Sequence, residues 1–335
     1  MRILILGARE VHTLLPYDKC ADAMREVLAA FARGEVHQPL RSVLRPEGAN
    51  GLMALMPSYR PGEAAAYGLK AICITPGNPA IGLDTHQGIV LLSSAQTGEP
   101  LGVLNASAVT EIRTAAVSAV ATALLARPDA DVLAIIGTGA QARAHLHAIA
   151  RSRALTQIRV AGREHARAIR FAESVRDQAT HAQDRAMPPV VACSSAREAV
   201  AGAGIIVTAT SSAQPVLERG WLAAGAHINA VGACVPAARE LDAATIAGAT
   251  LFADSRESVS SEAGDYLLAL AEGAIGPGHI RAEIGEILAG TAHGRSGDDE
   301  ITVFESLGLA IEDLAAAALV YRRAVESGVG SWADF

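Results

Sequence analysis

The first third of the chain combines one helical pattern with several short strand patterns. Apolar residues such as Met24 and Leu28 recur at helical spacing, which predicts a helix over residues 17–34. Apolar runs separated by Gly, Pro and Asn then predict strands over residues 41–44, 51–56, 68–75 and 88–93. One helix followed by short strands indicates an α+β unit with an antiparallel or mixed sheet.

The pattern changes near residue 106. Residues 108–126 are rich in Ala, Val and Leu and carry few charges, which predicts a largely buried helix. Strand and helix patterns then alternate, with strands over residues 132–136, 158–161, 190–193, 205–208, 227–231 and 250–253, and helices over residues 140–150, 165–178 and 196–201. This alternation predicts a doubly wound parallel sheet of the Rossmann type.

The last long apolar pattern runs from about Thr302 to Val325 and predicts a helix. It lies past the final predicted strand of the Rossmann sheet, so we expect it to return to the first domain. The predicted fold class is therefore α/β, with a Rossmann domain, residues 115–305, inserted in an α+β domain. We expect this α+β domain to comprise residues 1–114 and 306–335.

Composition and charge narrow the class of function. The 335 residues are 50% hydrophobic and 19% charged, which suffices for packed cores. The net charge is -7 and the chain has no long basic run, so we expect no nucleic-acid partner. These properties favour an enzyme that acts on a small molecule.

The four cysteines are scattered along the chain without a C-x-x-C pair: Cys20, Cys73, Cys193 and Cys234. We therefore expect neither a metal site nor a disulfide framework, and free thiols suit a reducing compartment. The apolar start of the chain is too short for a secretory signal, and the longest apolar stretches are interrupted before about 18 residues. These features predict a cytoplasmic protein without a membrane span.

The strongest motif follows the strand pattern at residues 132–136. Residues 137–142 read G-T-G-A-Q-A between a predicted strand and a predicted helix, which is the setting of a dinucleotide-binding loop. Gly137 permits the tight turn, and Gly139 lets a pyrophosphate approach the backbone. We expect the N–H groups of Ala140 and Gln141 to face the anion, with the helix dipole behind them.

The end of the second Rossmann strand bears on the choice of cofactor. An NAD site normally has Asp or Glu there, to hold the ribose 2′-hydroxyl, whereas this chain has Gly162 and then Arg163. Arg163 and Arg167 are suited to a 2′-phosphate, which predicts NADPH. The alternative is that both are solvated surface charges, and Glu164 nearby keeps NADH possible.

Two further loops follow strand patterns at the edge where open α/β sheets bind ligands. Thr210 lies in the loop after residues 205–208, and Val231 and Gly232 lie at the end of the strand over residues 227–231. We expect these three residues to contact the cofactor. Simple turn chemistry is the alternative explanation for Thr210.

The sequence resembles the ornithine cyclodeaminase/mu-crystallin family over nearly its whole length. The resemblance rests on ordered blocks at residues 68–70, 85–87, 97–101, 111–116, 137–142, 229–233, 301–308 and 310–313. It implies that the α+β domain binds the substrate and mediates dimerisation, and that the protein is a homodimer.

The resemblance also implies how an amino- or imino-acid substrate is held. A basic cluster binds the substrate carboxylate, and the matching positions are Arg41, Lys70 and Arg113. A buried carboxylate needs charge-assisted hydrogen-bond donors, which lysine and arginine side chains provide. The alternative explanation for Arg41 and Lys70 is that they lie on solvated strand faces and bind nothing. The remaining implied contacts are Arg113 and Thr114 at the cofactor, and Thr85, Ser306 and Leu307 at its nicotinamide end, where Leu307 also contacts the substrate.

The chain departs from the cyclodeaminase pattern at the residues that handle a diamino acid. Cyclodeaminases carry carboxylates where this chain has Cys234 and Ala54, and the lysine expected after Pro236 is replaced by alanine. In these respects the chain resembles the ketimine reductases, the mu-crystallin branch. This resemblance implies NAD(P)H-dependent reduction of Δ1-pyrroline-2-carboxylate to L-proline and of Δ1-piperideine-2-carboxylate to L-pipecolate.

Lys70, Arg113 and His86 are the candidate catalytic residues for this reaction. Lys70, or a water held by His86, is the candidate proton source for the C=N bond, and a purely structural histidine is the alternative for His86. Three other functions stay open: ornithine cyclodeamination, alanine-type amino-acid dehydrogenation, and non-catalytic binding of NADPH or another ligand by a crystallin-like protein.

Overall fold

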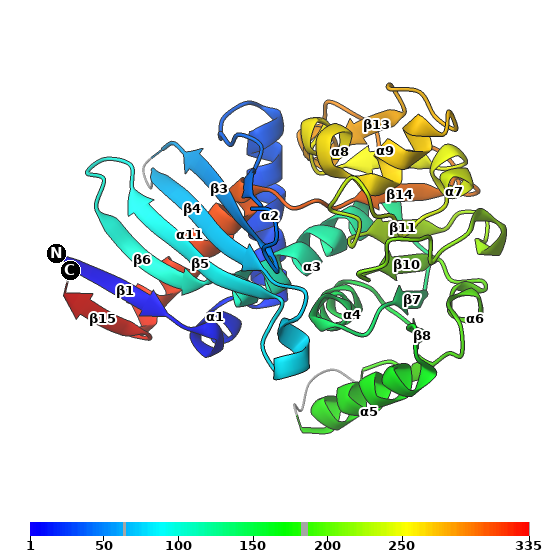
Figure 1. Cartoon of the computed structure of the whole chain (residues 1–335), viewed down its shortest axis with the longest axis horizontal. Coiled ribbons are helices and arrows are strands. Elements are labelled where there is room, and N and C mark those ends of the chain that lie inside the picture. Colours follow the sequence, from blue (N-terminus) through cyan, green and yellow to red (C-terminus); the bar gives the residue numbers. More distant parts are fainter. Residues whose placement is uncertain (63–64, 182–186, 335) are drawn as a thin grey trace. The chain divides into compact units, whose positions relative to one another are not determined.

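The computed structural model describes residues 1–62, 65–181 and 187–334. The chain divides into two compact units, each with its own sheet (Figure 1). The first unit consists of Met1–Thr114 and Gly308–Phe335, and the second unit of Ala115–Leu307.

The first unit is built on a mixed seven-stranded sheet. Its strands lie in the order β15 (Ser331–Asp334), β1 (Arg2–Leu6), β6 (Pro100–Asn105), β5 (His86–Ser94), β4 (Ala66–Ile74), β3 (Leu52–Arg60) and β2 (Ser42–Leu44). Strand β1 runs parallel to β6, and every other neighbouring pair is antiparallel. The helices are α1 (Ala8–Leu14), α2 (Tyr17–Ala32), the short 3-10 helix η1 (Asn78–Ile81) and α11 (Ala310–Ser327).

Helices α11 and α2 pack together, and α11 covers one face of this sheet. The strands alternate accordingly: on β3, Ala54 and Met56 are buried, whereas Leu55 between them is exposed. Leu314 of α11 packs against Leu92 of β5 on the covered face. Because side chains alternate across a strand, the opposite face of the sheet carries the exposed set.

The second unit is built on an eight-stranded sheet in which all neighbouring strands are parallel. The order is β13 (Ile280–Glu283), β12 (Thr250–Ala253), β14 (Thr302–Glu305), β11 (His227–Ala230), β10 (Ile205–Thr208), β7 (Val132–Ile136), β8 (Gln157–Ala161) and β9 (Val190–Ala192). Because β8 and β9 follow β7 in one direction and β10 and β11 in the other, the strand order reverses between β7 and β10. This is the Rossmann topology, and the reversal is where such sheets bind nucleotides.

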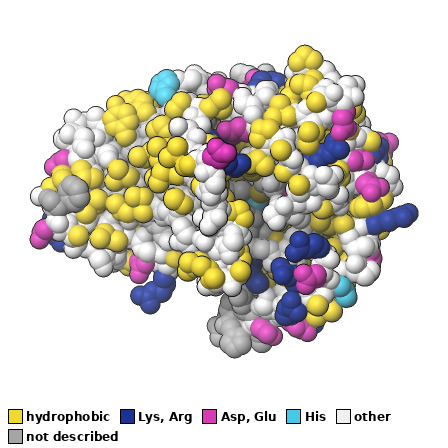
Figure 2. All heavy atoms as spheres, viewed as in Figure 1, with side chains coloured by type: hydrophobic (Ala, Val, Ile, Leu, Met, Phe, Trp, Pro, Cys, Tyr) yellow, Lys and Arg dark blue, Asp and Glu magenta, His cyan; other side chains and the backbone are white. Residues whose placement is uncertain are grey.

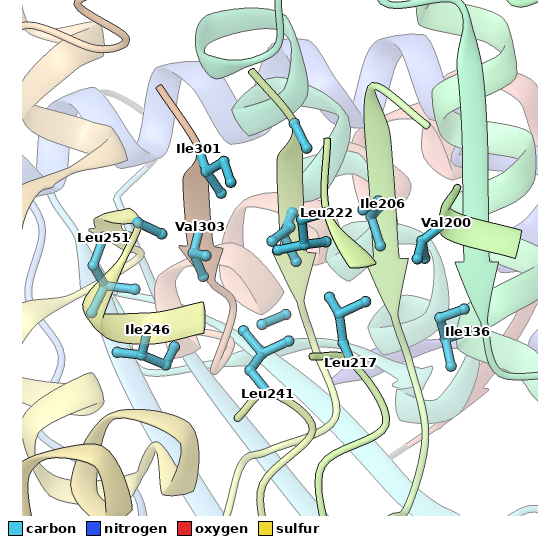
Figure 3. Close-up of a cluster of buried hydrophobic side chains, with 14 of the residues drawn as sticks. Ile136, Val200, Ile206, Leu217, Leu222, Leu241, Ile246, Leu251, Ile301 and Val303 are labelled. Carbon is cyan, nitrogen blue, oxygen red and sulfur yellow. The ribbon is translucent and has the colours of Figure 1, made fainter. Parts of the chain in front are cut away.

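The helices of the second unit connect these strands: α4 (Ala140–Ser152), α5 (His165–His181), α6 (Ala196–Val200), η2 (Arg219–Trp221), α7 (Ala243–Ala247), α8 (Arg256–Glu262), α9 (Gly264–Ala271) and α10 (Ile284–Leu288). One face of the sheet contributes Ile206, Val303 and Leu251 to a buried apolar cluster, which Figure 3 shows. Leu241 and Ile246 pack into the same cluster from the connecting segments.

Helix α3 (Ala106–Leu125) contains the division between the two units. It is long and apolar enough to cross a membrane by length and composition alone, but 78% of its most apolar window is buried within the protein. Such burial is typical of a core helix.

The structure corrects one predicted element. Residues 302–325 are not one helix past the Rossmann sheet: Thr302–Glu305 form β14, between β11 and β12, and the helix begins only at Ala310. The reason is local, because Gly308 has a φ of 81° and Leu309 is extended, which separates strand from helix. Strands β1, β6, β13 and β15 were not predicted.

Candidate active site

The loop between β7 and α4 has the geometry of a phosphate cradle. Gly137 has a φ of 135°, and a Cβ there would lie 2.4 Å from the carbonyl oxygen of Ala209, so only glycine lets the loop pack at the strand reversal. Beyond it, Gly139 precedes α4 without a side-chain cap, and no atom lies within 4 Å of its Cβ position. The first N–H groups of α4, at Ala140 and Gln141, therefore suit a pyrophosphate.

The end of β8 adjoins a basic hollow in the second unit. Gly162 lies against Thr138 of the glycine loop, with 3.1 Å from the Cβ position of Gly162 to Cγ2 of Thr138. Arg163 is exposed, and Nε of Arg167 lies 3.4 Å from the Glu164 carboxylate. The hollow has a volume of about 360 Å³ and is lined by Thr138, Arg143, Arg167, Arg170, Phe171 and Ser174. Figure 2 shows Lys and Arg side chains gathered in the region of α4 and α5.

Arg143 is held in place within this hollow. Its Nη2 donates a hydrogen bond to Oγ of Ser174 at 2.8 Å, and its guanidinium lies 4.8 Å from the ring centre of Phe171. A fixed arginine beside Arg167 and Arg170 gives the hollow a concentrated positive charge. Its place next to Gly162 suits the phosphate of an adenosine 2′-phosphate.

The cofactor residues predicted on the other loops lie at the carboxyl ends of their strands. The backbone N–H of Val231 donates to the carbonyl of Thr208 at 3.0 Å, and that of Ser306 donates to Ala230 at 2.9 Å. Thr210 and Gly232 both donate their backbone N–H groups to one buried carboxylate, Glu240, which the sequence analysis did not single out.

In the first unit, two buried carboxylates hold Lys70 and Arg113 together. Nζ of Lys70 lies 3.3 Å from Oδ1 of Asp313, and Nε of Arg113 donates to the same oxygen at 3.1 Å. Nη1 of Arg113 donates to Oε2 of Glu312 at 2.6 Å. All four residues are buried, so α11 supplies both counter-charges for a cationic pair from β4 and α3.

Arg41 joins the same cluster through the turn before α11. Its Nη2 donates to the carbonyl oxygen of Gly308 at 3.0 Å. A Cβ on Gly308 would lie 2.4 Å from Nη1 of Arg113, so glycine is required both for its left-handed backbone and for the approach of that guanidinium. The structure thus brings together Arg41, Lys70 and Arg113, three residues far apart in the sequence.

The environment changes the proton affinity of two side chains in this cluster. Burial lowers the pKa of Lys70 to about 8, an effect that Asp313 partly opposes. His86 is exposed at the start of β5, yet enough protein surrounds its ring that desolvation, with the charges of Lys70 and Arg113, lowers its pKa. Near pH 7, Lys70 is therefore mainly protonated and His86 is neutral.

Other predicted residues have less distinctive surroundings. Thr85 is half-buried, and Thr114 is buried with a hydroxyl that has no hydrogen-bond partner among the described residues. Leu307 packs into the apolar core of the second unit, with its N–H donated to Asp254 at 2.7 Å. Cys234 donates its thiol to the carbonyl of Val231 at 3.3 Å.

Sequence reasoning assigned no role to the residues that organise the cationic cluster of the first unit. Glu312 and Asp313 were noted only as part of a family block, and Gly308 likewise. The one available signal was a pair of acidic residues in the first turn of a largely apolar helix, α11. Such residues are usually explained by the helix dipole alone.

The fold and site define a Rossmann-type unit with a dinucleotide loop, joined to a unit that holds a buried cationic cluster. A family model described as ornithine cyclodeaminase/mu-crystallin family matches residues 1–328. The chain belongs to this family.

Two curated relatives indicate the chemistry found in the family. A Delta(1)-pyrroline-2-carboxylate reductase of Bacillus cereus is 37% identical over 99% of this chain and 100% of its own length. The ketimine reductase mu-crystallin of Mus musculus is 38% identical over 89% of this chain and 90% of its own length.

Two solved structures resemble this one closely. A Thermococcus litoralis Delta(1)-pyrroline-2-carboxylate reductase in complex with NADH and L-proline has a TM-score of 0.93 and 36% identity, over 98% of this chain and 99% of that one. An archaeal alanine dehydrogenase dimer with bound NAD has a TM-score of 0.91 and 34% identity, over the whole of both chains.

Proposed function

We propose that this protein is an NAD(P)H-dependent oxidoreductase that reduces cyclic ketimines, with Δ1-pyrroline-2-carboxylate and Δ1-piperideine-2-carboxylate as substrates. One observation carries the proposal. Arg41, Lys70 and Arg113 contribute three positive charges to the cluster, and Glu312 and Asp313 contribute two negative ones. The cluster therefore retains one positive charge, which matches the single carboxylate of an imino acid.

Each residue of the cluster has a task in this reaction. Arg41 and Arg113 hold the substrate carboxylate, and Glu312 and Asp313 fix the Arg113 fork so that the imine is presented in one orientation. A bound nicotinamide supplies the hydride. Lys70 donates a proton from Nζ to the imine nitrogen, for which a pKa of about 8 is well matched near neutral pH. Neutral His86 is less suited to that role.

Two residues outside this cluster, Cys234 and Ala54, disfavour a diamino acid. The thiol of Cys234 donates to a backbone carbonyl, and Ala54 is buried and apolar on β3. Neither side chain can pair with a second ammonium group. A cyclic ketimine brings no such group, so it avoids the cost of an unpaired charge.

A substrate panel distinguishes the proposal from the two remaining alternatives. Cofactor oxidation is followed with cyclic imino acids, and separately with pyruvate plus ammonia. We expect turnover with the cyclic imino acids to exceed alanine formation. Faster turnover of pyruvate and ammonia would favour an alanine-type dehydrogenase, and cofactor binding without any turnover would favour a storage or carrier protein.

We predict that NADPH is preferred to NADH. Arg163 and the basic hollow beside Gly162 support a 2′-phosphate, although the relatives of known structure named above hold NADH or NAD. The Arg163→Asp variant should lower the ratio of kcat/KM for NADPH to that for NADH by about 10- to 100-fold, because a charge-assisted contact becomes a repulsion. Arg197→Asp, the same change on α6, is the control. An unmodified protein that uses NADH at least as well as NADPH would refute the prediction.

We also propose a homodimer, formed through the open face of the first sheet. Apolar side chains exposed on that face include Ile5, Leu44, Met53, Leu55, Tyr67 and Ile89, and Figure 2 shows apolar side chains spread over this region. Such a patch is unusual on a monomer. Helix α11 is largely covered by its own unit, so it offers little apolar surface for an interface.

The oligomeric state tests this interface. Leu55→Glu together with Ile89→Glu places charges on either side of Ala71 on the open face, and should convert the dimer to a monomer at micromolar concentration. Val325→Glu, on an exposed position of α11, should leave the dimer intact. Sedimentation that finds the unmodified protein monomeric contradicts the proposal.

We further propose a cytoplasmic location, for which the four free cysteines are suited.

A further inference from the structure

Glu240 connects the two loops that leave the carboxyl ends of β10 and β11. Its side chain is fully buried. Oε1 accepts the backbone N–H of Thr210 at 2.6 Å, and Oε2 accepts the backbone N–H of Gly232 at 2.7 Å. One carboxylate thus uses both oxygens to join two loops at the sheet edge where nucleotides bind.

The packing around this carboxylate explains why residue 232 is glycine. A Cβ there would lie 2.3 Å from the carbonyl oxygen of Thr210 and 2.6 Å from Cδ of Glu240. Any side chain would therefore push the carboxylate and the first loop away from the second. Gly232 is needed for the contact between the loops, whatever it does toward a ligand.

The backbone of Glu240 is itself anchored. Its carbonyl accepts the N–H of Val216 at 2.7 Å, and its N–H donates to Oδ1 of Asp265 at 2.8 Å. Leu241 donates to the same oxygen of Asp265 at 2.8 Å. The carboxylate that joins the loops is therefore held by groups outside them, and its position is fixed before any ligand arrives.

Two further buried carboxyl groups lie close enough to influence Glu240. Burial and the charge of Glu240 raise the pKa of Asp265 to about 7, and burial with the neighbouring carboxylates raises that of Glu305 well above its usual range. Oε1 of Glu305 has no hydrogen-bond partner among the described residues. Burial raises the pKa of Glu240 as well, and the N–H groups of Thr210 and Gly232 that it accepts oppose that rise.

We propose that Glu240 is a positioning residue for the nicotinamide cofactor, which locks the loops at residues 208–212 and 231–234 together into a preformed cradle. The inference rests on the proposed function for the identity of the ligand. Its physical basis is that a loop already ordered by buried contacts loses less conformational freedom on binding than a loop that must be ordered by the ligand.

The Glu240→Gln variant tests the inference directly. A glutamine accepts through one oxygen only, and its amide would face an N–H donor at the other loop. We expect the Kd for NADPH and for NADH to rise about 10-fold or more, the cofactor KM to rise with it, and kcat at saturating cofactor to change less than about threefold. In the free protein, the amide hydrogens of Thr210 and Gly232 should exchange faster with solvent.

Asp242→Asn is the matched control. Asp242 lies two residues away and also accepts backbone N–H groups, from Thr245 at 2.9 Å and Arg219 at 3.2 Å, but it contacts neither loop. It should leave the cofactor Kd and the exchange of the loop amides unchanged even if it lowers stability. Equal effects of the two variants on the cofactor Kd would reduce Glu240 to a structural residue and overturn the inference.

Two outcomes separate this inference from the proposed function. Kd is measured by nucleotide fluorescence without any substrate, so failure to reduce imines does not affect the test. If the protein binds no nicotinamide nucleotide, the proposed function and this inference both fail, whereas unchanged cofactor Kd in a folded Glu240→Gln protein overturns the inference alone. If Glu240→Gln does not fold, Gly232→Ala, which separates the same loops with the carboxylate intact, should give the same faster exchange of the loop amides in the free protein. No change in that exchange would count against the proposal.

Discussion

Replacing Arg113 with Met should abolish imine reduction and destabilise the protein. The variant loses the guanidinium that we propose holds the substrate carboxylate, and it leaves Glu312 and Asp313 buried beside one remaining buried cation, Lys70. Breaking a buried ion pair in this way costs about 3–5 kcal/mol. We expect kcat/KM to fall at least about 1,000-fold, from lost charge pairing and orientation together. Steady-state kinetics and urea unfolding measure the two effects.

Two companion variants keep this prediction testable. Arg113→Lys retains the charge but not the fork that spans Glu312 and Asp313, so it should fold and still lose about 100-fold in kcat/KM. Arg41→Met removes a half-buried residue whose Nη2 donates to the backbone carbonyl of Gly308, so it should mainly raise the substrate KM with little loss of stability. An Arg113→Lys enzyme of normal activity would remove Arg113 from the substrate site.

Lys70 should impose an upper pH limit on the reaction. Because its pKa is lowered to about 8, the proton that we propose it donates is lost as the pH rises through that value, and kcat should fall about tenfold per pH unit above it. Lys70→Arg keeps a cation beside Asp313 but does not release a proton in this range. That variant should lose about 100-fold or more in kcat at pH 7, and its profile should lack the decline above pH 8.

Stability gives a second measure of the same pKa. The folded protein binds the Lys70 proton less tightly than the unfolded chain does, whose lysine titrates at about 10.4. The cost of burying the charge is therefore present below pH 8 and disappears as the pH rises toward 10.4, so this residue alone makes folding more favourable over that window. The Lys70→Arg variant should lack this contribution. A pH profile of kcat identical in the two proteins would exclude Lys70 as the proton donor.

The sequence was sufficient to predict strands and helices where the hydrophobic pattern and the turn residues agree. The strands and helices from Val132 to Thr208 were predictable because each buried strand is bounded by turn residues and followed by an amphipathic helix. Thr302–Glu305 was misread because a four-residue strand buried on both faces has no alternation, and the helical pattern of α11 follows it closely. Strand β15 was missed because its residues are mostly exposed at a sheet edge.

The site was only partly predictable, for a different reason. Arg41, Lys70 and Arg113 were found through resemblance to a family, not through spacing, since they lie on separate elements. Their partners Glu312 and Asp313 look like ordinary first-turn acids in sequence, and Glu240 lies in a segment without a recognisable motif. Whether a carboxylate is solvated or buried against a backbone N–H depends on tertiary packing, which a single sequence does not encode locally.

The central claim is reduction of a preformed cyclic ketimine, and one comparison tests it most directly. Purified protein is supplied with NADPH and Δ1-pyrroline-2-carboxylate in one reaction, and with NAD and L-ornithine in another, and proline and ammonia are measured. The account predicts rapid proline formation from the imine and negligible ammonia from ornithine, because Cys234 and Ala54 offer no carboxylate to the second amine. Conversion of ornithine to proline as fast as the imine is reduced would contradict it.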